Sequence, residues 1–467
     1  MQERRLAILF ITFALIGCGP RKSKGDGPDG STPPGPPDFA VPCLGLQCQQ
    51  KDCGELGATT LVGKVYAPNG KLPLYNAVVY VPNADLEPFA DAVTCDRCNG
   101  HVSGNPLVQA VTGPDGAFQL DNVPAGIDIP LVVQVGKWRR KVLIDVPECT
   151  TTEVDPKYTR LPKNQTVNDK EGNMPKLAIA TGSVDPMECL LLKIGIDPEE
   201  IKEPGQGTRV EFYKAAHSPG STISGSTPSA ADPSKGIYTD LKRLLGYDVV
   251  IFPCEGGEYD QDSLPSKGSP NRSNLAQYLT AGGRVFATHY SYDWLTYPGS
   301  PYNQVAKPQL NGLWPKDQSS FGSDIVPTVA KLVTNFPKGM AFMKWLISAG
   351  AKSAQTTLNI LAIRRDIDGV DTNYAQPWAT VNNSGTPATP LLTFNTPPDA
   401  PPDDMGVPQY CGRVVYSDFH VAASESFGST FPKSCKGNDM TDQEKALAFM
   451  LFDLSSCVQS DMIPPVW

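Results

Sequence analysis

Several motifs that would assign a reaction are missing from this sequence of 467 residues. It contains no G-x-x-x-x-G-K-[ST] and no G-x-S-x-G, which argues against a P-loop NTPase and against an α/β-hydrolase. Its formal net charge is -9, and its densest basic run, residues 137–141, lies between strand-like segments. Because it has no basic stripe, we do not expect nucleic acid as a partner.

Long apolar runs are also missing, apart from residues 6–16 near the N-terminus. That run follows Arg4 and Arg5 and is short for a membrane-spanning helix, so it is typical of an export signal. It ends in Leu-Ile-Gly before Cys18, which resembles the bacterial lipobox. The resemblance implies cleavage before Cys18 and lipidation of that cysteine, whereas the alternative is an ordinary signal peptide with a chance cysteine.

Residues 1–18 are therefore predicted to be a lipoprotein signal peptide. Gly19, the residue after the cysteine, implies sorting to the outer membrane by resemblance to the usual rule. Residues 19–42 are rich in Gly, Pro and Ser and predict a disordered tether. We expect a cell-envelope lipoprotein, held to the membrane through Cys18 and facing the periplasm or the cell surface.

Cysteine is abundant, with 12 residues in the chain. In an oxidising compartment the default is disulfide pairing, and the odd number left without Cys18 requires at least one unpaired thiol. Cys95 and Cys98 have the spacing of half a zinc site. Because no second C-x-x-C occurs, a disulfide or loop staple is favoured over zinc there. Residues 43–59 form a cysteine-rich lead-in.

Residues 60–155 predict an all-β sandwich, because short β-branched and aromatic segments alternate with Gly, Pro and Asn turns. The stretches "GKVYAPNGKLPLYNAVVYVP" and "VTGPDGAFQLDNVPAG" resemble the carboxypeptidase regulatory-like domain, a transthyretin-like (prealbumin-like, carbohydrate-binding-like) fold. The resemblance implies a scaffold or a spacer that contacts glycan or protein, without peptidase residues. Residues 156–175 are expected to be a linker.

Residues 176–457 predict an α/β domain with a parallel sheet, of flavodoxin-like type. The segments "KLAIATG", "RVEFY", "DVVIFPCEGG" and "GRVFATHY" read as strands separated by helical stretches. Their continuous apolar character favours a sheet covered on both faces, with ligands at the carboxyl ends of the strands. Residues 458–467 are a tail.

The order of these segments resembles the class I glutamine amidotransferase-like fold and its ThuA-like branch. "YDVVIFPCEGG" stands in the place of that fold's Gly-Gly strand, and "LAQYLTAGGRVFATHYSY" in the place of its helix and nucleophile-elbow strand. "CGRVVYSDFHV" stands where the amidotransferase histidine is delivered. An insertion at about 296–410 matches nothing in the family pattern.

One departure from the family decides the expected chemistry. The nucleophilic cysteine that attacks the amide carbonyl is replaced by His289, and Cys254 lies one strand earlier, out of register. Glutamine hydrolysis is therefore not expected. Several polar residues should meet at the strand ends instead; they are Cys254, Glu255, His289, Tyr290, Tyr292, Asp293, Asp418 and His420.

Two readings of these strand-end residues remain open. His289, His420 and Glu255 would be the catalytic group of a carbohydrate-processing or other hydrolase, with an acid–base pair or a divalent metal. Otherwise the histidines close a vestigial site. The domain order also resembles exported lipoproteins of myxobacterial type. Our first expectation is a module that binds glycan, another small polar ligand or an envelope protein, and that needs no cofactor.

Overall fold

The structure is a computed structural model. It describes residues 43–98, 101–296, 302–303, 305–308, 328–353, 355–361, 363, 366–383, 386–421, 430–437 and 439–465. The expected signal peptide, Cys18 and the tether 19–42 lie outside the described residues. Residues Leu44–Trp467 form one compact unit.

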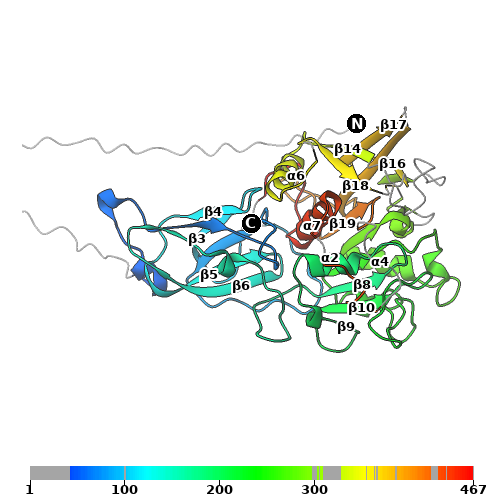
Figure 1. The fold of residues 1–467 in the computed structure, drawn as a ribbon, viewed down its shortest axis with the longest axis horizontal. Helices are drawn as coiled ribbons and strands as arrows, with labels where there is room; N and C mark the ends of the chain where they lie inside the picture. Colours follow the sequence, from blue (N-terminus) through cyan, green and yellow to red (C-terminus); the bar gives the residue numbers. More distant parts are fainter. Residues whose placement is uncertain are drawn as a thin grey trace, which may run out of the picture. The chain divides into compact units, whose positions relative to one another are not determined.

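The first part of this unit is all-β, in two sheets (Figure 1). One sheet has the order β4-β1-β7, with β1 Thr60–Lys64, β4 Ala117–Leu120 and β7 Thr151–Glu153. The other has the order β3-β2-β5-β6, with β2 Val78–Pro82, β3 Pro106–Val111, β5 Gly126–Val135 and β6 Trp138–Val146. Apolar side chains of both sheets, such as Leu61, Phe118, Val79 and Val133, belong to one buried core. The predicted all-β architecture of this segment is therefore confirmed.

The second part is built on a sheet of 10 strands. In spatial order these are β15 Thr357–Ile360, β14 Thr328–Leu332, β17 Ala375–Asn383, β18 Thr386–Thr396, β19 Gly412–Ser417, β12 Arg284–Thr288, β11 Val249–Phe252, β8 Leu177–Thr181, β10 Val210–Lys214 and β9 Ile201–Lys202. A separate antiparallel pair joins β13 Ala306–Pro308 to β16 Ile367–Val370.

The prediction of a parallel sheet is correct for one side only. Strands β9, β10, β8, β11, β12 and β19 are parallel to one another, as the apolar strand pattern indicated. The strands β18, β17, β14 and β15 extend the sheet in antiparallel fashion. These four come from the insertion at 296–410, where β17 and β18 follow each other closely along the chain and pair antiparallel as neighbours do.

Helices cover both faces of the parallel part. On one face lie α2 Met187–Lys193 and α7 Asp442–Ser455, and on the other α3 Leu241–Leu244, α4 Asn271–Thr280 and α5 Asp293–Thr296. The helix α6 Pro337–Ser348 packs instead against Trp378 of β17, in the antiparallel part, and α1 Pro156–Thr159 precedes the sheet. Short 3-10 turns are η1 Gly45–Gln49, η2 Gly54–Leu56, η3 Pro198–Glu200, η4 Gln261–Ser263 and η5 His289–Tyr292. Figure 1 shows α7, in red, beside β19, and α7 packs against both β12 and β19.

Side chains of one strand alternate between two buried cores. In β8, Leu177 and Ile179 face the core that contains residues of α2 and α7, whereas Ala178 and Ala180 face the core with residues of α3 and α4. Alternation with a period of two places successive side chains on opposite faces. Because both faces are covered, the first four positions of β8 are all apolar, which explains the continuous apolar runs of the sequence.

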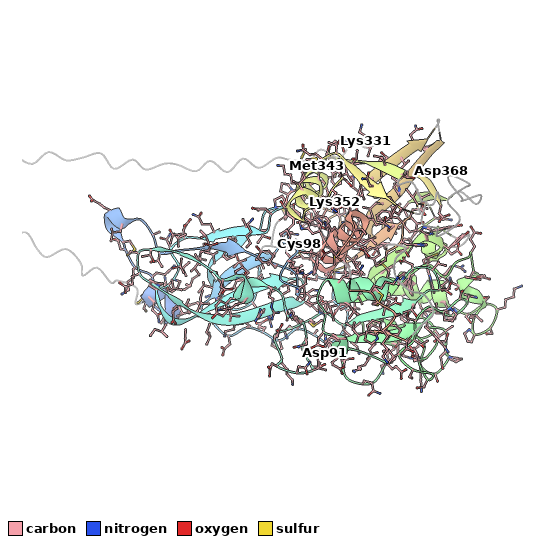
Figure 2. All side chains as sticks on the ribbon, in the orientation of Figure 1. Asp91, Cys98, Lys331, Met343, Lys352 and Asp368 are labelled. Atoms are coloured by element: carbon pink, nitrogen blue, oxygen red, sulfur yellow. A yellow bond between two sulfur atoms is a disulfide. The ribbon has the colours of Figure 1, made fainter. Side chains whose placement is uncertain are left out.

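Disulfides link segments that are far apart in the sequence. Both partners are known for four of them, which are Cys53–Cys149, Cys95–Cys411, Cys98–Cys457 and Cys189–Cys435. Figure 2 labels Cys98, whose bond to Cys457 spans 359 residues of sequence. The expectation that Cys95 and Cys98 enter disulfides is confirmed. Each bonds to a residue beyond the β-rich part, which ties the loop before β3 to the larger sheet.

Two further observations complete the description of the fold. Within the part of the chain that the structure covers, Cys254 is the one free cysteine, and it is buried. No helix among those same residues combines the length and the apolar character needed to cross a membrane.

Candidate functional site

The central feature of the site is the turn after β12. His289 follows the last residue of that strand directly and has a φ of +50°, in the left-handed region that residues with a Cβ seldom adopt. A left-handed residue between a strand and a helical turn is typical of a nucleophile elbow, which lifts one side chain above the sheet edge. The elbow geometry is therefore present, and the side chain that it carries is an imidazole.

Three strand ends bring a thiol and two imidazoles together. Cys254 follows β11, His289 follows β12 and His420 follows β19, and these strands are parallel neighbours in the sheet. The two imidazole rings stack with their centroids 3.6 Å apart and 30° between their planes. One donor atom from each of the three side chains lies within 4.8 Å of the other two. All three residues are buried, with at most 3% of their surface exposed.

Two carboxylates also lie close to His289. One ligand atom each from His289, Asp366 and Asp418 also lies within 4.8 Å of the other two. The Asp418 carboxylate accepts the backbone N–H of Asp366 at 2.7 Å. The Tyr416 hydroxyl lies 2.9 Å from the His289 carbonyl oxygen and 3.3 Å from Asp418 Oδ1. His289 is thus shared by two groups of possible metal ligands.

The buried side chain of Asp185 connects three of these strand ends through hydrogen bonds. The Asp185 carboxylate accepts the Thr288 hydroxyl at 2.5 Å and the Val421 backbone N–H at 2.9 Å. Thr288 Oγ1 in turn accepts the backbone N–H of Cys254 at 3.0 Å. Burial is the main cause that raises the pKa of Asp185 to about 7. This network fixes the backbone next to each of the three clustered side chains.

The Cys254 thiol lies in a setting that differs from that of a thiol nucleophile. Burial raises the pKa of the thiol well above its ordinary value, which lowers its thiolate content. The Gly256 backbone N–H, 3.3 Å from the sulfur, acts in the opposite direction. Cys254 is therefore neither at the turn after β12 nor in a setting that favours its thiolate.

Glu255, predicted as a catalytic residue, belongs to neither of the two groups around His289. Its carboxylate accepts the backbone N–H groups of His217 at 2.9 Å and Ser218 at 3.3 Å. Burial raises the pKa of Glu255. The imidazole of His217 stacks on Tyr259, with ring centroids 4.3 Å apart. Glu255 thus anchors the loop after β10.

The remaining predicted residues lie in η5 and α5 and make other contacts. The hydroxyl of Tyr292 donates to Glu258, and the Asp293 carboxylate accepts the Tyr259 backbone N–H at 2.8 Å. Burial raises the pKa of Asp293 to about 7. Tyr290 is half-buried and packs against the core with α3 and α4.

Of the predicted site residues, the structure brings together Cys254, His289, Asp418 and His420. It adds Asp366, which the sequence reasoning missed. Asp366 comes from the insertion that matched no family pattern, directly before β16, so the sequence offered no signal for it.

A separate hollow of about 500 Å³ lies at one end of β17 and β18. Tyr374, Gln376, Asn373 and Tyr410 contribute to its lining. Tyr374 keeps 37% of its surface exposed. Unlike the buried cluster around His289, this hollow offers aromatic, amide and hydroxyl groups to solvent.

Comparisons with known proteins find similarity in solved structures alone. No protein-family model and no curated protein matches the chain. A protein described as ThuA-like from Bacteroides uniformis is 10% identical and covers 61% of this chain and 93% of its own, with a TM-score of 0.30. The cytoplasmic protein STM3548 from Salmonella typhimurium is 11% identical, covers 60% and 99%, and has a TM-score of 0.31.

A third similar structure is the glutaminase domain of Trypanosoma brucei CTPS with bound acivicin. It is 11% identical and covers 61% of this chain and 96% of its own, with a TM-score of 0.29. At these TM-scores the likeness alone assigns neither a family nor a function. The architecture of the larger part therefore rests on its own strand order, with a parallel α/β sheet that carries a histidine at the elbow.

Proposed function

We propose that this protein is an envelope lipoprotein that binds a glycan or another small polar ligand, and that it does not hydrolyse glutamine. The observation that carries the proposal is the residue at the elbow. A glutaminase needs a thiolate there to attack the amide carbonyl and form a thioester. His289 holds that position with the left-handed backbone of an elbow, and its imidazole cannot form the thioester.

The open hollow beside β17 is the ligand site that we propose. The residues clustered around His289 are buried, so they leave little surface for a ligand of sugar size. The hollow of about 500 Å³ has a volume suited to a small ligand. The ring faces of Tyr374 and Tyr410 can stack on a sugar ring, while the amides of Asn373 and Gln376 can bond its hydroxyl groups.

The rest of the chain has a supporting role in this proposal. The lipobox-like ending at Cys18 supports a lipid anchor, and the Gly- and Pro-rich tether 19–42 supports separation of the folded part from the membrane. The all-β part, similar in sequence to carboxypeptidase regulatory-like domains, would act as a spacer. The larger part would be a ThuA-like descendant that has lost its nucleophile. Labelling with radioactive palmitate tests the anchor, because Cys18→Ser should abolish incorporation.

The ligand proposal is tested by screening the full chain against a glycan array and measuring affinity for the strongest hit. Stacking on an aromatic ring contributes about 0.5–1.5 kcal/mol, so Tyr374→Ala should weaken binding roughly 2- to 12-fold. Tyr158→Ala, in α1, is the matched control and should leave the affinity unchanged. Equal affinities for Tyr374→Ala and the wild type would remove the hollow from the proposal.

A glutaminase assay of the same preparation tests the second half of the proposal. We expect no glutamate release above the blank. Release of glutamate that Cys254→Ser abolishes would overturn the proposal, because Cys254 would then be a displaced nucleophile. Turnover of a glycoside panel that both His289→Asn and His420→Asn abolish would replace the binding module with a hydrolase.

A further inference from the structure

The geometry points to a transition-metal site of zinc type, with Cys254, His289 and His420 as protein ligands and Asp418 or water in the fourth position. This inference does not depend on the proposed function, since it requires neither a glycan nor a membrane anchor. It starts from the three donor atoms that lie within 4.8 Å of one another at three adjacent strand ends.

The types of donor atom select the metal. One thiolate and two imidazoles suit Zn²⁺, whereas Mg²⁺ and Ca²⁺ prefer oxygen ligands. With metal–ligand bonds of about 2.0–2.3 Å, tetrahedral donors lie roughly 3.3–3.8 Å apart. The three donors of this site all lie within 4.8 Å of one another, and the two stacked imidazole rings would rotate so that their in-plane nitrogen lone pairs meet at the ion.

The second group, His289 with Asp366 and Asp418, shares its histidine with the first. The two groups therefore meet at His289. Asp418 is already oriented by the Asp366 N–H and the Tyr416 hydroxyl. Its carboxylate, which has an oxygen within 4.8 Å of a His289 nitrogen, is the protein candidate for the fourth ligand, and an oxygen donor in that position is common for zinc.

The backbone on either side of the ligands is fixed in advance. The Tyr416 hydroxyl bonds the His289 carbonyl at 2.9 Å, and the Gln443 side-chain amide donates to the His420 carbonyl at 2.7 Å. The Gly256 N–H lies 3.3 Å from the Cys254 sulfur, where it stabilises negative charge on that atom. Such outer contacts orient metal ligands and raise the affinity of the site.

The charges in the cluster match a divalent cation. On binding, the Cys254 thiol would lose its proton to solvent and the sulfur would carry one negative charge. Asp418 supplies a second negative charge, so the charges of these two ligands together balance that of a Zn²⁺ ion. Without a cation, carboxylates this deeply buried are costly to keep charged.

The test uses the purified full chain, stripped with a chelator and then loaded with Zn²⁺ or Co²⁺ before desalting. We expect one equivalent of bound metal per chain. The Co²⁺ form should show a sulfur-to-cobalt charge-transfer absorption together with the visible bands of a tetrahedral ion. Cys254→Ser should lose the charge-transfer absorption. His289→Asn, which keeps a residue type that tolerates positive φ, should weaken Zn²⁺ binding at least ~100-fold.

His217→Asn is the matched control, because His217 belongs to neither ligand group and should leave the metal content unchanged. If the ligand variants fail to fold, X-ray absorption of the zinc-loaded wild type still tests the site, with one sulfur and two imidazoles expected around the metal. A wild type that retains no metal after desalting would overturn the inference. So would a metal shell without sulfur.

Discussion

Removal of the Arg413 guanidinium should be among the most damaging single changes in the larger part of the protein. Arg413 lies in β19, the strand that carries Asp418 and His420 beyond its end. Its side chain is 1% exposed and bonds Asp453 and Asp461, each at 2.7 Å, and Asn395 at 2.8 Å. Arg413→Met keeps an apolar stem of similar length and removes the positive charge.

The expected magnitude follows from the charges that remain. Lys338, also 1% exposed, lies 2.9 Å from Asp453 and 3.1 Å from Asp461, so the wild-type cluster has two positive and two negative groups. Without Arg413, one buried negative charge is uncompensated. Breaking a buried ion pair in this way costs about 3–5 kcal/mol, which lowers the folding equilibrium constant by a factor of roughly 10²–10³ or more.

Urea unfolding of the oxidised full chain measures this loss as a lower midpoint at unchanged slope. The matched control is Lys157→Met, because the Lys157–Asp155 pair is exposed and should contribute at most about 1 kcal/mol. The double variant Arg413→Met with Asp453→Asn removes the excess negative charge and should recover part of the loss. Equal midpoints for Arg413→Met and Lys157→Met would refute the reasoning.

Acid unfolding gives a second readout of the same cluster. Burial alone would raise the pKa of Asp461, but the charges of Arg413 and Lys338 outweigh it and hold that pKa below its usual value. A carboxyl with a lowered pKa stabilises the fold above the unfolded pKa of about 4, and the contribution is lost as the pH falls further. Arg413→Met should therefore flatten the acid side of the stability profile.

Three further predictions concern other parts of the fold. Thr441→Ala removes the side-chain hydrogen bond to the Glu444 N–H in the capping box of α7. The free energy of unfolding, measured in urea, should fall by about 1 kcal/mol. An unchanged free energy of unfolding would exclude a stabilising role for this cap. Burial raises the pKa of Asp293 to about 7, so the folded state holds a proton that the unfolded state releases between about pH 4 and 7, and stability falls as the pH rises through that range. The free energy of unfolding of Asp293→Asn minus that of the wild type should therefore be larger at about pH 8 than at about pH 5. A difference that does not change with pH would contradict the raised pKa. Replacing Cys98 and Cys457 by Ala should cost about 2–5 kcal/mol, measured against the oxidised wild type.

The parallel half of the larger sheet could be predicted because its strands are buried on both faces. Their continuous apolar runs, such as "DVVIF", are separated by helical stretches, and that pattern has few other solutions. The antiparallel half could not be predicted in the same way. Strands β14, β17 and β18 come from an insertion without family resemblance, and which strand they would pair with depends on contacts that no local pattern encodes.

From the sequence one could predict which strand ends meet at the site, but not the direction of each side chain there. His289, Cys254, Asp418 and His420 follow parallel strands, so their meeting at one edge follows from the topology. Glu255 is adjacent to Cys254 in sequence, yet its carboxylate is bound by the His217 and Ser218 N–H groups. The direction in which a side chain points after a strand end depends on the conformation of the local turn. The sequence does not specify that conformation residue by residue.

A substitution at His289, whose backbone is left-handed, can distinguish a functional metal site from a vestigial one. A residue with a Cβ costs roughly 1–2 kcal/mol in this conformation, and glycine avoids that cost. If the elbow were a relic, His289→Gly would change stability by a fixed amount, whether or not zinc is present. If His289 binds metal, zinc at 100 times the wild-type dissociation constant stabilises the wild type by about 2.7 kcal/mol and a variant that binds 100-fold more weakly by about 0.4 kcal/mol. The gap between the two proteins should then widen by about 2 kcal/mol or more in thermal or urea unfolding, and a gap independent of zinc would identify the elbow as vestigial.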